Sequence, residues 1–130
     1  MRDLKSNIKP MTSIAPQSLT AAANGTGIDV KGYDSAAVVF NAGAIGGTTP
    51  SFTFAVQESD DNSTFTDVAA ASLNGTAPVV TTNNAGISWV GYMGNKRYIR
   101  AIAKTVSGTS PTLLATAVVV LGNPAKMPTT

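Results

Sequence analysis

The side chains of this 130-residue chain that could carry chemistry gather around one acidic turn. Glu58 with Asp60 or Asp67 could form the two carboxylates of a glycosidase, because that reaction needs only two acids held at a defined separation. Asp60, Asp61 and Asn62 could give oxygen ligands to calcium, but the longer acidic loop and the distant bidentate Glu of a dedicated site are missing. Acids crowded around one turn are more often solvated turn formers, so we expect a hairpin turn here and no metal site.

A second candidate is the basic stretch from Lys96 to Arg100, which includes Tyr98 and follows Trp89 and Tyr92. Cations mixed with aromatic rings can bind nucleic acid, and aromatic rings can stack on sugars. Successive side chains of a strand point to opposite faces, however, so this stretch forms no uniform basic strip. We therefore expect a sheet strand whose cations pair locally or reach solvent, and no nucleic-acid partner. Trp89, Tyr92 and Tyr98 are kept as stacking candidates for the alternative hypothesis, a carbohydrate-binding module.

Several classes of chemistry are excluded by what the sequence lacks. It contains no His and no Cys, and only 12% of its residues are charged. The commonest general base, a thiolate nucleophile, disulfides and Cys-ligated metals are therefore absent, and no GxSxG or SxxK motif indicates a serine hydrolase. We expect neither an enzyme nor a cofactor. No apolar run approaches the length of a membrane span, so we expect no membrane partner and synthesis in the cytoplasm.

Charge is distributed unevenly along the chain, although the net charge is only +2. Residues 17–95 contain one cation and six acids, whereas residues 96–130 contain five cations and no acid. Two interpretations remain open. Either the strands interleave and neutralise one another, or the two signs form complementary patches that are used in assembly.

Short apolar segments separated by turn residues indicate an all-β domain, and no segment of a dozen residues has the apolar spacing of a helix. The strands are expected over 17–23, 27–31, 35–41, 51–59, 64–69, 77–82, 86–92, 96–104 and 112–121. Their spacing is typical of an antiparallel β-sandwich, jelly-roll or Ig-like, of about eight strands.

The expected organisation is one domain with short ends. Residues 1–16 contain two prolines and no strand or helix period, so they are predicted to form an extended N-terminal arm. Residues 17–123 form the β-sandwich domain, and residues 124–130 form a short C-terminal tail. Within the domain, the Gly- and Thr-rich stretch from Ala42 to Pro50 is predicted to be a loop.

The last expected strand, 112–121, is apolar on both of its faces. Leu114, Val118 and Val120 lie on one side. The other side carries Leu113, Ala115, Ala117, Val119 and Leu121. This pattern predicts a central strand or a second packed layer, and the alternative is that one face meets another subunit.

Parts of the sequence suggest relatives. Gln57 to Val68, QESDDNSTFTDV, followed by Lys96 to Ala101, KRYIRA, resembles β-sandwich modules that include discoidin-like sugar binders. The whole chain, with its basic start and the ending Ala117 to Pro124, AVVVLGNP, looks more like small virion proteins of tailed bacteriophages, particularly capsid decoration or cement proteins.

This resemblance implies a β-sandwich on the capsid exterior of the virion, commonly a homotrimer, which bridges neighbouring subunits of the major capsid protein and stabilises the assembled head. Its mechanism would be adhesion. An arm that orders on docking trades entropy for contact, so Arg2, Lys5, Lys9 and Ile14 are the candidate capsid-binding residues. A tail or neck component of the same particle is a further hypothesis, which differs only in the partner.

Overall fold

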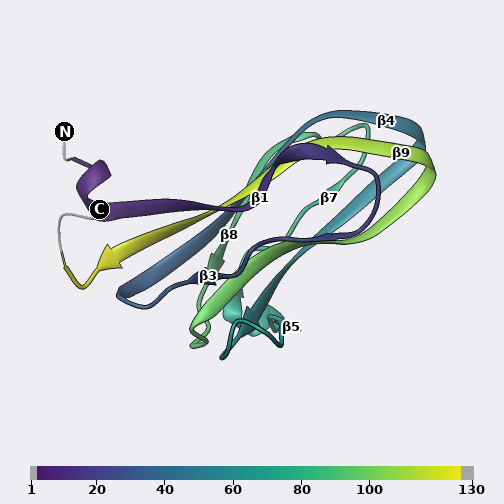
Figure 1. The fold of residues 1–130 in the computed structure, drawn as a ribbon. Coiled ribbons are helices and arrows are strands. Elements are labelled where there is room, and N and C mark those ends of the chain that lie inside the picture. Colours follow the sequence, from purple (N-terminus) through teal and green to yellow (C-terminus); the bar gives the residue numbers. More distant parts are fainter. Residues whose placement is uncertain (1–2, 127–130) are drawn as a thin grey trace.

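The computed structural model describes residues 3–126, and β-strands make up most of this part of the chain (Figure 1). The strands are β1 (Ile8–Leu19), β2 (Ala23–Asn24), β3 (Ile28–Asp29), β4 (Tyr33–Ser59), β5 (Thr66–Asp67), β6 (Leu73–Asn74), β7 (Val79–Val80), β8 (Gly86–Tyr92) and β9 (Tyr98–Pro124). Among residues 3–126 the helical elements are two three-residue 3₁₀ turns, η1 (Lys5–Asn7) and η2 (Ala70–Ser72), and neither is long enough to cross a membrane. Every strand pair is antiparallel, which confirms the predicted all-β class.

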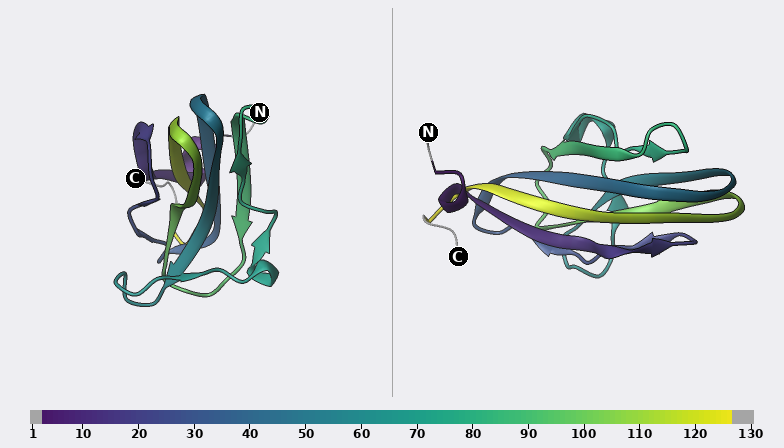
Figure 2. Two further views of the ribbon diagram at one scale, coloured as in Figure 1. Left: turned by 90° about the vertical axis from the view of Figure 1, so that its right-hand side faces the viewer. Right: turned by 90° about the horizontal axis from the view of Figure 1, so that it is seen from above.

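Two strands of 27 residues each, β4 and β9, organise the molecule. They pair with each other from Tyr33 opposite Pro124 to Ser59 opposite Tyr98. Near their midpoints both strands bend and run back, so that one long ribbon contributes to two layers packed face to face (Figures 1 and 2). The sandwich therefore arises from a single sheet folded over on itself.

The bend lies where the sequence predicts a loop. The stretch from Ala42 to Pro50 remains part of strand β4, so the predicted loop is wrong. Gly47 and Thr49 of β4 have φ angles of 106° and 45°, and Gly108 and Ser110 of β9 have angles of 107° and 48°. These left-handed residues turn both strands without ending their pairing, as bulges do. Consequently the predicted strands 35–41 and 51–59 are two halves of β4, and 96–104 and 112–121 are two halves of β9.

The two layers have different strand orders. The first layer contains β1, the C-terminal half of β9, the N-terminal half of β4, β8 and β6, in that order. The second layer contains the other halves of β4 and β9, extended by β5 and β7 beside β4 and by β2 and β3 beside β9. The view from above in Figure 2 shows β1, β9 and β4 of the first layer running side by side.

The core lies between the layers and is built from alternate positions of the long strands. Val38 and Phe40 come from the N-terminal half of β4, and Phe52, Phe54 and Val56 come from its C-terminal half; all five are buried. The ring centroids of Phe40 and Phe54 are 5.4 Å apart, so the two halves of β4 pack directly against each other. The period-two pattern of residues 51–58 thus places its apolar face in the core.

The segment expected to form a free N-terminal arm is instead largely part of the sheet. From Ile8 onward it forms β1, which pairs with the C-terminal half of β9. Ser13 is 3% exposed and links β1 to the second layer, because its hydroxyl donates to the Thr26 carbonyl at 2.9 Å and accepts the Ala101 N–H at 3.0 Å. The prediction of an arm over residues 1–16 is therefore wrong for residues 8–16, which belong to the sandwich domain.

The remaining expectations are met to different degrees. The predicted strand 86–92 matches β8. The predicted strands 64–69 and 77–82 contain only the two-residue strands β5 and β7. Strand β9 includes Pro124, the first residue of the predicted tail, while residues 127–130 of that tail lie outside the described residues.

Candidate assembly surface

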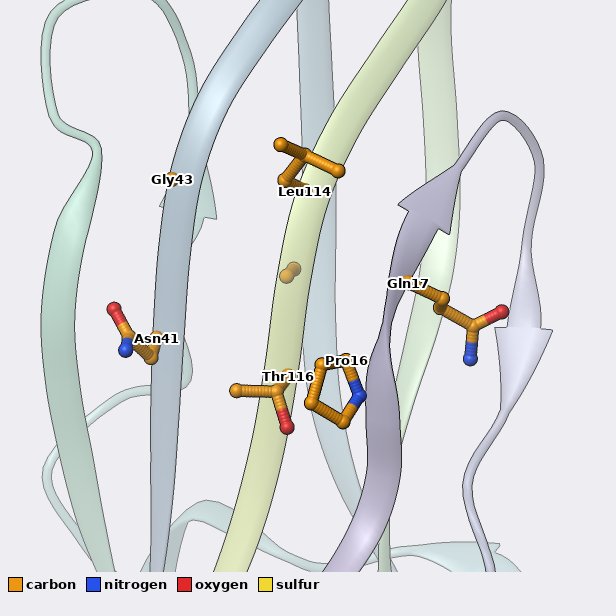
Figure 3. Close-up of a pocket in the computed structure, with 7 residues that line it drawn as sticks. Pro16, Gln17, Asn41, Gly43, Leu114 and Thr116 are labelled. Carbon is orange, nitrogen blue, oxygen red and sulfur yellow. The ribbon is translucent and has the colours of Figure 1, made fainter.

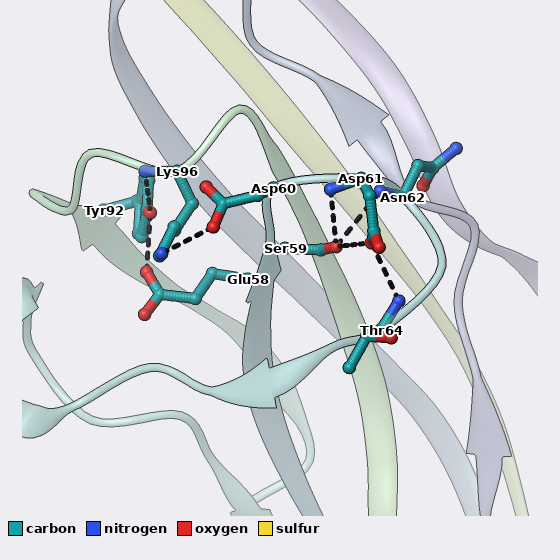
Figure 4. Close-up of polar contacts among 8 residues, drawn as sticks. All are labelled: Glu58, Ser59, Asp60, Asp61, Asn62, Thr64, Tyr92 and Lys96. Carbon is teal, nitrogen blue, oxygen red and sulfur yellow. Dashed lines mark hydrogen bonds and ion pairs between the residues drawn. The ribbon is translucent and has the colours of Figure 1, made fainter.

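The side-chain oxygen atoms of the acidic turn form hydrogen bonds and an ion pair with other groups of the chain (Figure 4). Asp61 Oδ1 accepts hydrogen bonds from the N–H groups of Thr64 and Ser63, each at 2.9 Å, and from the Ser59 hydroxyl at 2.8 Å. These donors, the Thr64 N–H first, lower the pKa of Asp61 to about 2. Strands β4 and β5 pair on either side, which confirms the predicted hairpin turn. Within residues 3–126 no group of three or more acids is arranged to hold a metal ion.

The candidate carboxylate pair is engaged in contacts beside this turn. The Tyr92 hydroxyl donates to Glu58 Oε1 at 2.7 Å and accepts the Lys96 N–H at 3.1 Å. The Lys96 ammonium forms an ion pair with Asp60 at 2.7 Å. Burial of Tyr92, together with its bond to Glu58, raises the pKa of the Tyr92 hydroxyl to about 12. Glu58 and Asp60 therefore hold β8 and the following loop against the end of β4.

The cations of the basic stretch contact polar side chains from earlier segments of the chain. The guanidinium of Arg97 binds both carboxylate oxygens of Asp29, at 2.9 and 3.1 Å. Arg100 donates to Gln57 Oε1 at 2.7 and 3.0 Å, and its guanidinium carbon lies 4.0 Å from the centre of the Phe65 ring. The ion pairs are Lys96–Asp60, Arg97–Asp29 and Lys104–Asp67. Of the two interpretations of the uneven charge, the structure supports interleaved strands that neutralise one another.

The three candidate stacking residues do not form one platform. Tyr92 is 8% exposed and its hydroxyl is engaged with Glu58. Tyr98 pairs with Asp29 in the second layer, whereas Trp89 pairs with Val39 in the first layer. Trp89 alone presents a largely free ring, with 70% of the residue exposed.

The candidate capsid-binding residues are also separated. Ile14 is 2% exposed and packs in the core, so its assignment to a docking surface is wrong. Lys9 lies in β1 opposite Leu121, and Lys5 lies in η1, just before β1. Arg2 lies outside the described residues.

One surface of the sandwich is both apolar and free of charge. In the first layer, alternate side chains of β1, β9, β4 and β8 point away from the core. We call this set the outer face; it consists of Pro10, Thr12, Ala37, Val39, Asn41, Ile87, Trp89, Gly91, Leu114, Thr116, Val118 and Val120. None of these residues is charged. Ile87 of β8 is 62% exposed and Leu114 of β9 is 54% exposed, so the exposed apolar surface of this face extends from β8 to β9.

The outer face explains why the last predicted strand is apolar on both sides. The C-terminal half of β9 is a central strand, between β1 and β4, as the sequence predicts. Its second apolar side, with Val118 and Val120 half-buried and Leu114 exposed, is not covered by another layer within the described chain. The predicted second packed layer on this side is therefore wrong. Contact with another subunit is the alternative that remains.

A shallow hollow of about 400 Å³ lies in the outer face, over the C-terminal half of β9 (Figure 3). Pro16 and Gln17 of β1 border one side, and Asn41 and Gly43 of β4 border the other. Its floor is formed by the stretch 114–116 of β9. The hollow contains no charged side chain, so it is suited to a large uncharged group.

Comparison with solved structures shows a similar fold. The crystal structure of the SPBc2 prophage-derived protein YomS is similar, with a TM-score of 0.50 and 17% sequence identity over 88% of this chain and 93% of that chain. At this identity the likeness concerns the fold alone. No protein-family model and no curated protein matches the sequence.

Proposed function

We propose that this chain is a structural component of a phage particle, where it binds the capsid exterior and stabilises the assembled head by bridging subunits of the major capsid protein. It acts by adhesion and performs no reaction. Binding that occurs only on the assembled shell adds to the stability of the shell, because a ligand selective for one state shifts the equilibrium toward that state.

The single observation that carries this proposal is the uncharged outer face. Soluble monomers rarely leave a contiguous apolar area of several strands in contact with water, and such areas mark sites of protein contact. Trp89 lies in this area with 70% of its surface exposed, and tryptophan is among the residues that contribute most to binding at protein interfaces. The second layer, in contrast, carries exposed ion pairs between Arg97 and Asp29 and between Lys104 and Asp67, so it presents charged groups to water.

Two other observations support a role in a particle. The fold is similar to that of a prophage-derived protein. The acids that could have formed a catalytic pair, Glu58 and Asp60, instead join neighbouring segments of the chain. Lys5 and Lys9, near the start of β1, remain candidate capsid contacts, as does Arg2, which lies outside the described residues; all three add positive charge to this end of the sequence.

The proposal is tested by locating the chain in particles made by the phage or prophage that encodes it. Cryo-electron microscopy should reveal a β-sandwich on the outside of the head, and immunogold label should lie there. Heads stripped of the chain should disassemble at a lower temperature and regain resistance when purified chain is added. A chain that is absent from particles, or present only on tails or necks, contradicts the proposal. Glycan binding that is lost in Trp89→Ala, with an unchanged circular dichroism spectrum, would instead favour carbohydrate binding.

A further inference from the structure

The outer face carries a projecting side chain and a hollow at different places on the same surface. Trp89 projects from β8 with 70% of the residue exposed. The hollow of about 400 Å³ lies over β9, on the far side of β4. We propose that a second copy of this chain covers the outer face, with Trp89 of each copy inserted into the hollow of the other.

The strand register gives the spacing of the two features. Trp89 pairs with Val39 of β4, whereas Ala115, in the floor of the hollow, pairs with Ala42. Three residues along the strands and two strands across the sheet each correspond to ~10 Å, so Trp89 and the hollow are roughly 14 Å apart. A two-fold axis that lies in the interface and bisects the line between them makes both insertions at once, as an isologous interface requires.

The lining of the hollow fits an indole ring. In Figure 3 the ring of Pro16 lies beside Thr116, and Leu114 stands at one end of the hollow. These groups provide apolar contacts, and a buried tryptophan also needs an acceptor for its ring N–H. The Thr116 hydroxyl donates to the Ile14 carbonyl at 2.6 Å, and its oxygen keeps lone pairs that can accept the indole N–H at the hollow.

The absence of charge favours a second copy as the occupant. A surface that meets itself across a two-fold axis brings like charges together, which is unfavourable, and the outer face avoids this cost because it has none. Its residues, Val39, Val118 and Val120 among them, therefore suit contact with an identical apolar sheet.

The available area is sufficient for a specific pair. Four strands spaced ~4.8 Å apart, with about seven residues at ~3.4 Å along each, give the outer face roughly 450 Å² of projected area. A corrugated surface exceeds its projection, so two copies bury about 1,000 Å², the size at which specific interfaces begin. Pro10 and Pro16 lie in the edge strand β1 and carry no backbone N–H, which disfavours edge-to-edge pairing there and leaves the face as the contact surface.

The proposal is tested on the purified full-length chain in the absence of particles. Sedimentation equilibrium over a dilution series should give a monomer–dimer equilibrium. Trp89 is the only tryptophan of the chain, so its fluorescence emission should shift to longer wavelength as the dimer dissociates. Trp89→Glu and Thr116→Lys should each weaken the dimer about tenfold or more, because each places a charge in a buried contact.

Mixing provides the decisive arm of the experiment. Trp89→Glu retains an intact hollow and Thr116→Lys retains an intact Trp89, so the mixture can form one native insertion and one Glu–Lys contact. We expect dimers to reappear on mixing. Val79→Glu, which changes an exposed apolar residue of the second layer, serves as the matched control and should leave the dimer unchanged. Circular dichroism establishes that each variant is folded.

Three results overturn the inference: a wild-type chain that stays monomeric, a closed trimer, or a mixture of the two variants that stays monomeric. A dimer joined through the outer face would bind heads through its other surfaces, where Lys5 and Lys9 are the candidate contacts, so the inference and the proposed function can be tested separately. A monomer in solution that still decorates heads overturns only the inference. A dimer that is absent from particles overturns only the proposed function.

Discussion

Gly47 and Gly108 lie against each other's strands at the bend shared by β4 and β9. A Cβ atom on Gly47 would lie 2.7 Å from the Ser110 carbonyl oxygen, and one on Gly108 would lie 2.7 Å from the Thr49 carbonyl oxygen. Both glycines have φ near 107°. The two strands thus turn together because each leaves room for the backbone of the other.

Alanine at either glycine should destabilise the fold. We expect Gly47→Ala and Gly108→Ala each to lower the free energy of unfolding by about 2 kcal/mol or more, because strain from positive φ adds to a clash with backbone. Urea denaturation measures the loss. Gly122→Ala is the matched control in the same strand, since its Cβ would lie 3.8 Å from the nearest atom. Equal effects at Gly108 and Gly122 would contradict this account of the bend.

Truncation at the N-terminus should separate the short beginning of the chain from β1. Removing residues 1–7 should leave the sandwich folded, because β1 begins at Ile8. Removing residues 1–16 should unfold it, because the deletion takes away most of an edge strand together with buried Ser13 and Ile14. Circular dichroism melting and limited proteolysis are the measurements. A folded, protease-resistant product of the longer deletion would show that β1 is dispensable.

Tyr92→Phe should cost about 1–2 kcal/mol of unfolding free energy, because Glu58 loses a donor and the Lys96 N–H loses an acceptor. Tyr98→Phe is the control and should have a smaller effect. The raised pKa of Tyr92 predicts that the contribution of its hydroxyl to the free energy of unfolding is complete below pH 10 and is lost as the pH rises through about 12. An ultraviolet titration in which Tyr92 ionises like a free tyrosine would argue against the bond to Glu58.

Asp61 should make the acidic turn sensitive to acid. The pKa of Asp61 falls from an ordinary 3.8 to about 2 in the folded chain. Its contribution to the free energy of unfolding is therefore complete above pH 3.8 and is lost as the pH falls to about 2. The difference in unfolding free energy between wild type and Asp61→Ala should therefore shrink over this interval. Urea denaturation of both proteins at a series of pH values measures this difference. A difference that stays constant down to pH 2 would exclude this role for the carboxylate.

The sequence predicts the fold class well because period-two alternation is a local signal. Residues 86–92 and 51–59 alternate clearly, and both are found in strands. This local signal does not reveal the bend, because Gly- and Thr-rich composition is typical of loops. Only the pairing of Gly46 with Thr112 and of Thr48 with Thr109 keeps the stretch around Gly47 in a strand. Likewise, Pro10 and Pro16 argue against a central strand but not against an edge strand such as β1.

The candidate surface was only partly predictable. The two apolar sides of residues 112–121 predicted a central strand or a second packed layer, with contact to another subunit as the alternative. The structure confirms the central strand and leaves its outer side uncovered within residues 3–126, and contact with another subunit stays a prediction. Ile87, Trp89 and Gly91 alternate with Ser88 and Val90, which is a local signal for an uncharged outward side. The hollow has no such signal, because it depends on the register that brings Pro16 and Asn41 to opposite sides of β9.

β4 and β9 each belong to both layers, so the two central strands of each layer continue into the other layer. A pull that separates the layers must strain two continuous strands through their shared bend, where an ordinary sandwich would let flexible connections give way. Mechanical failure should therefore come in one step, with a single force peak in a stretching experiment and no half-opened intermediate.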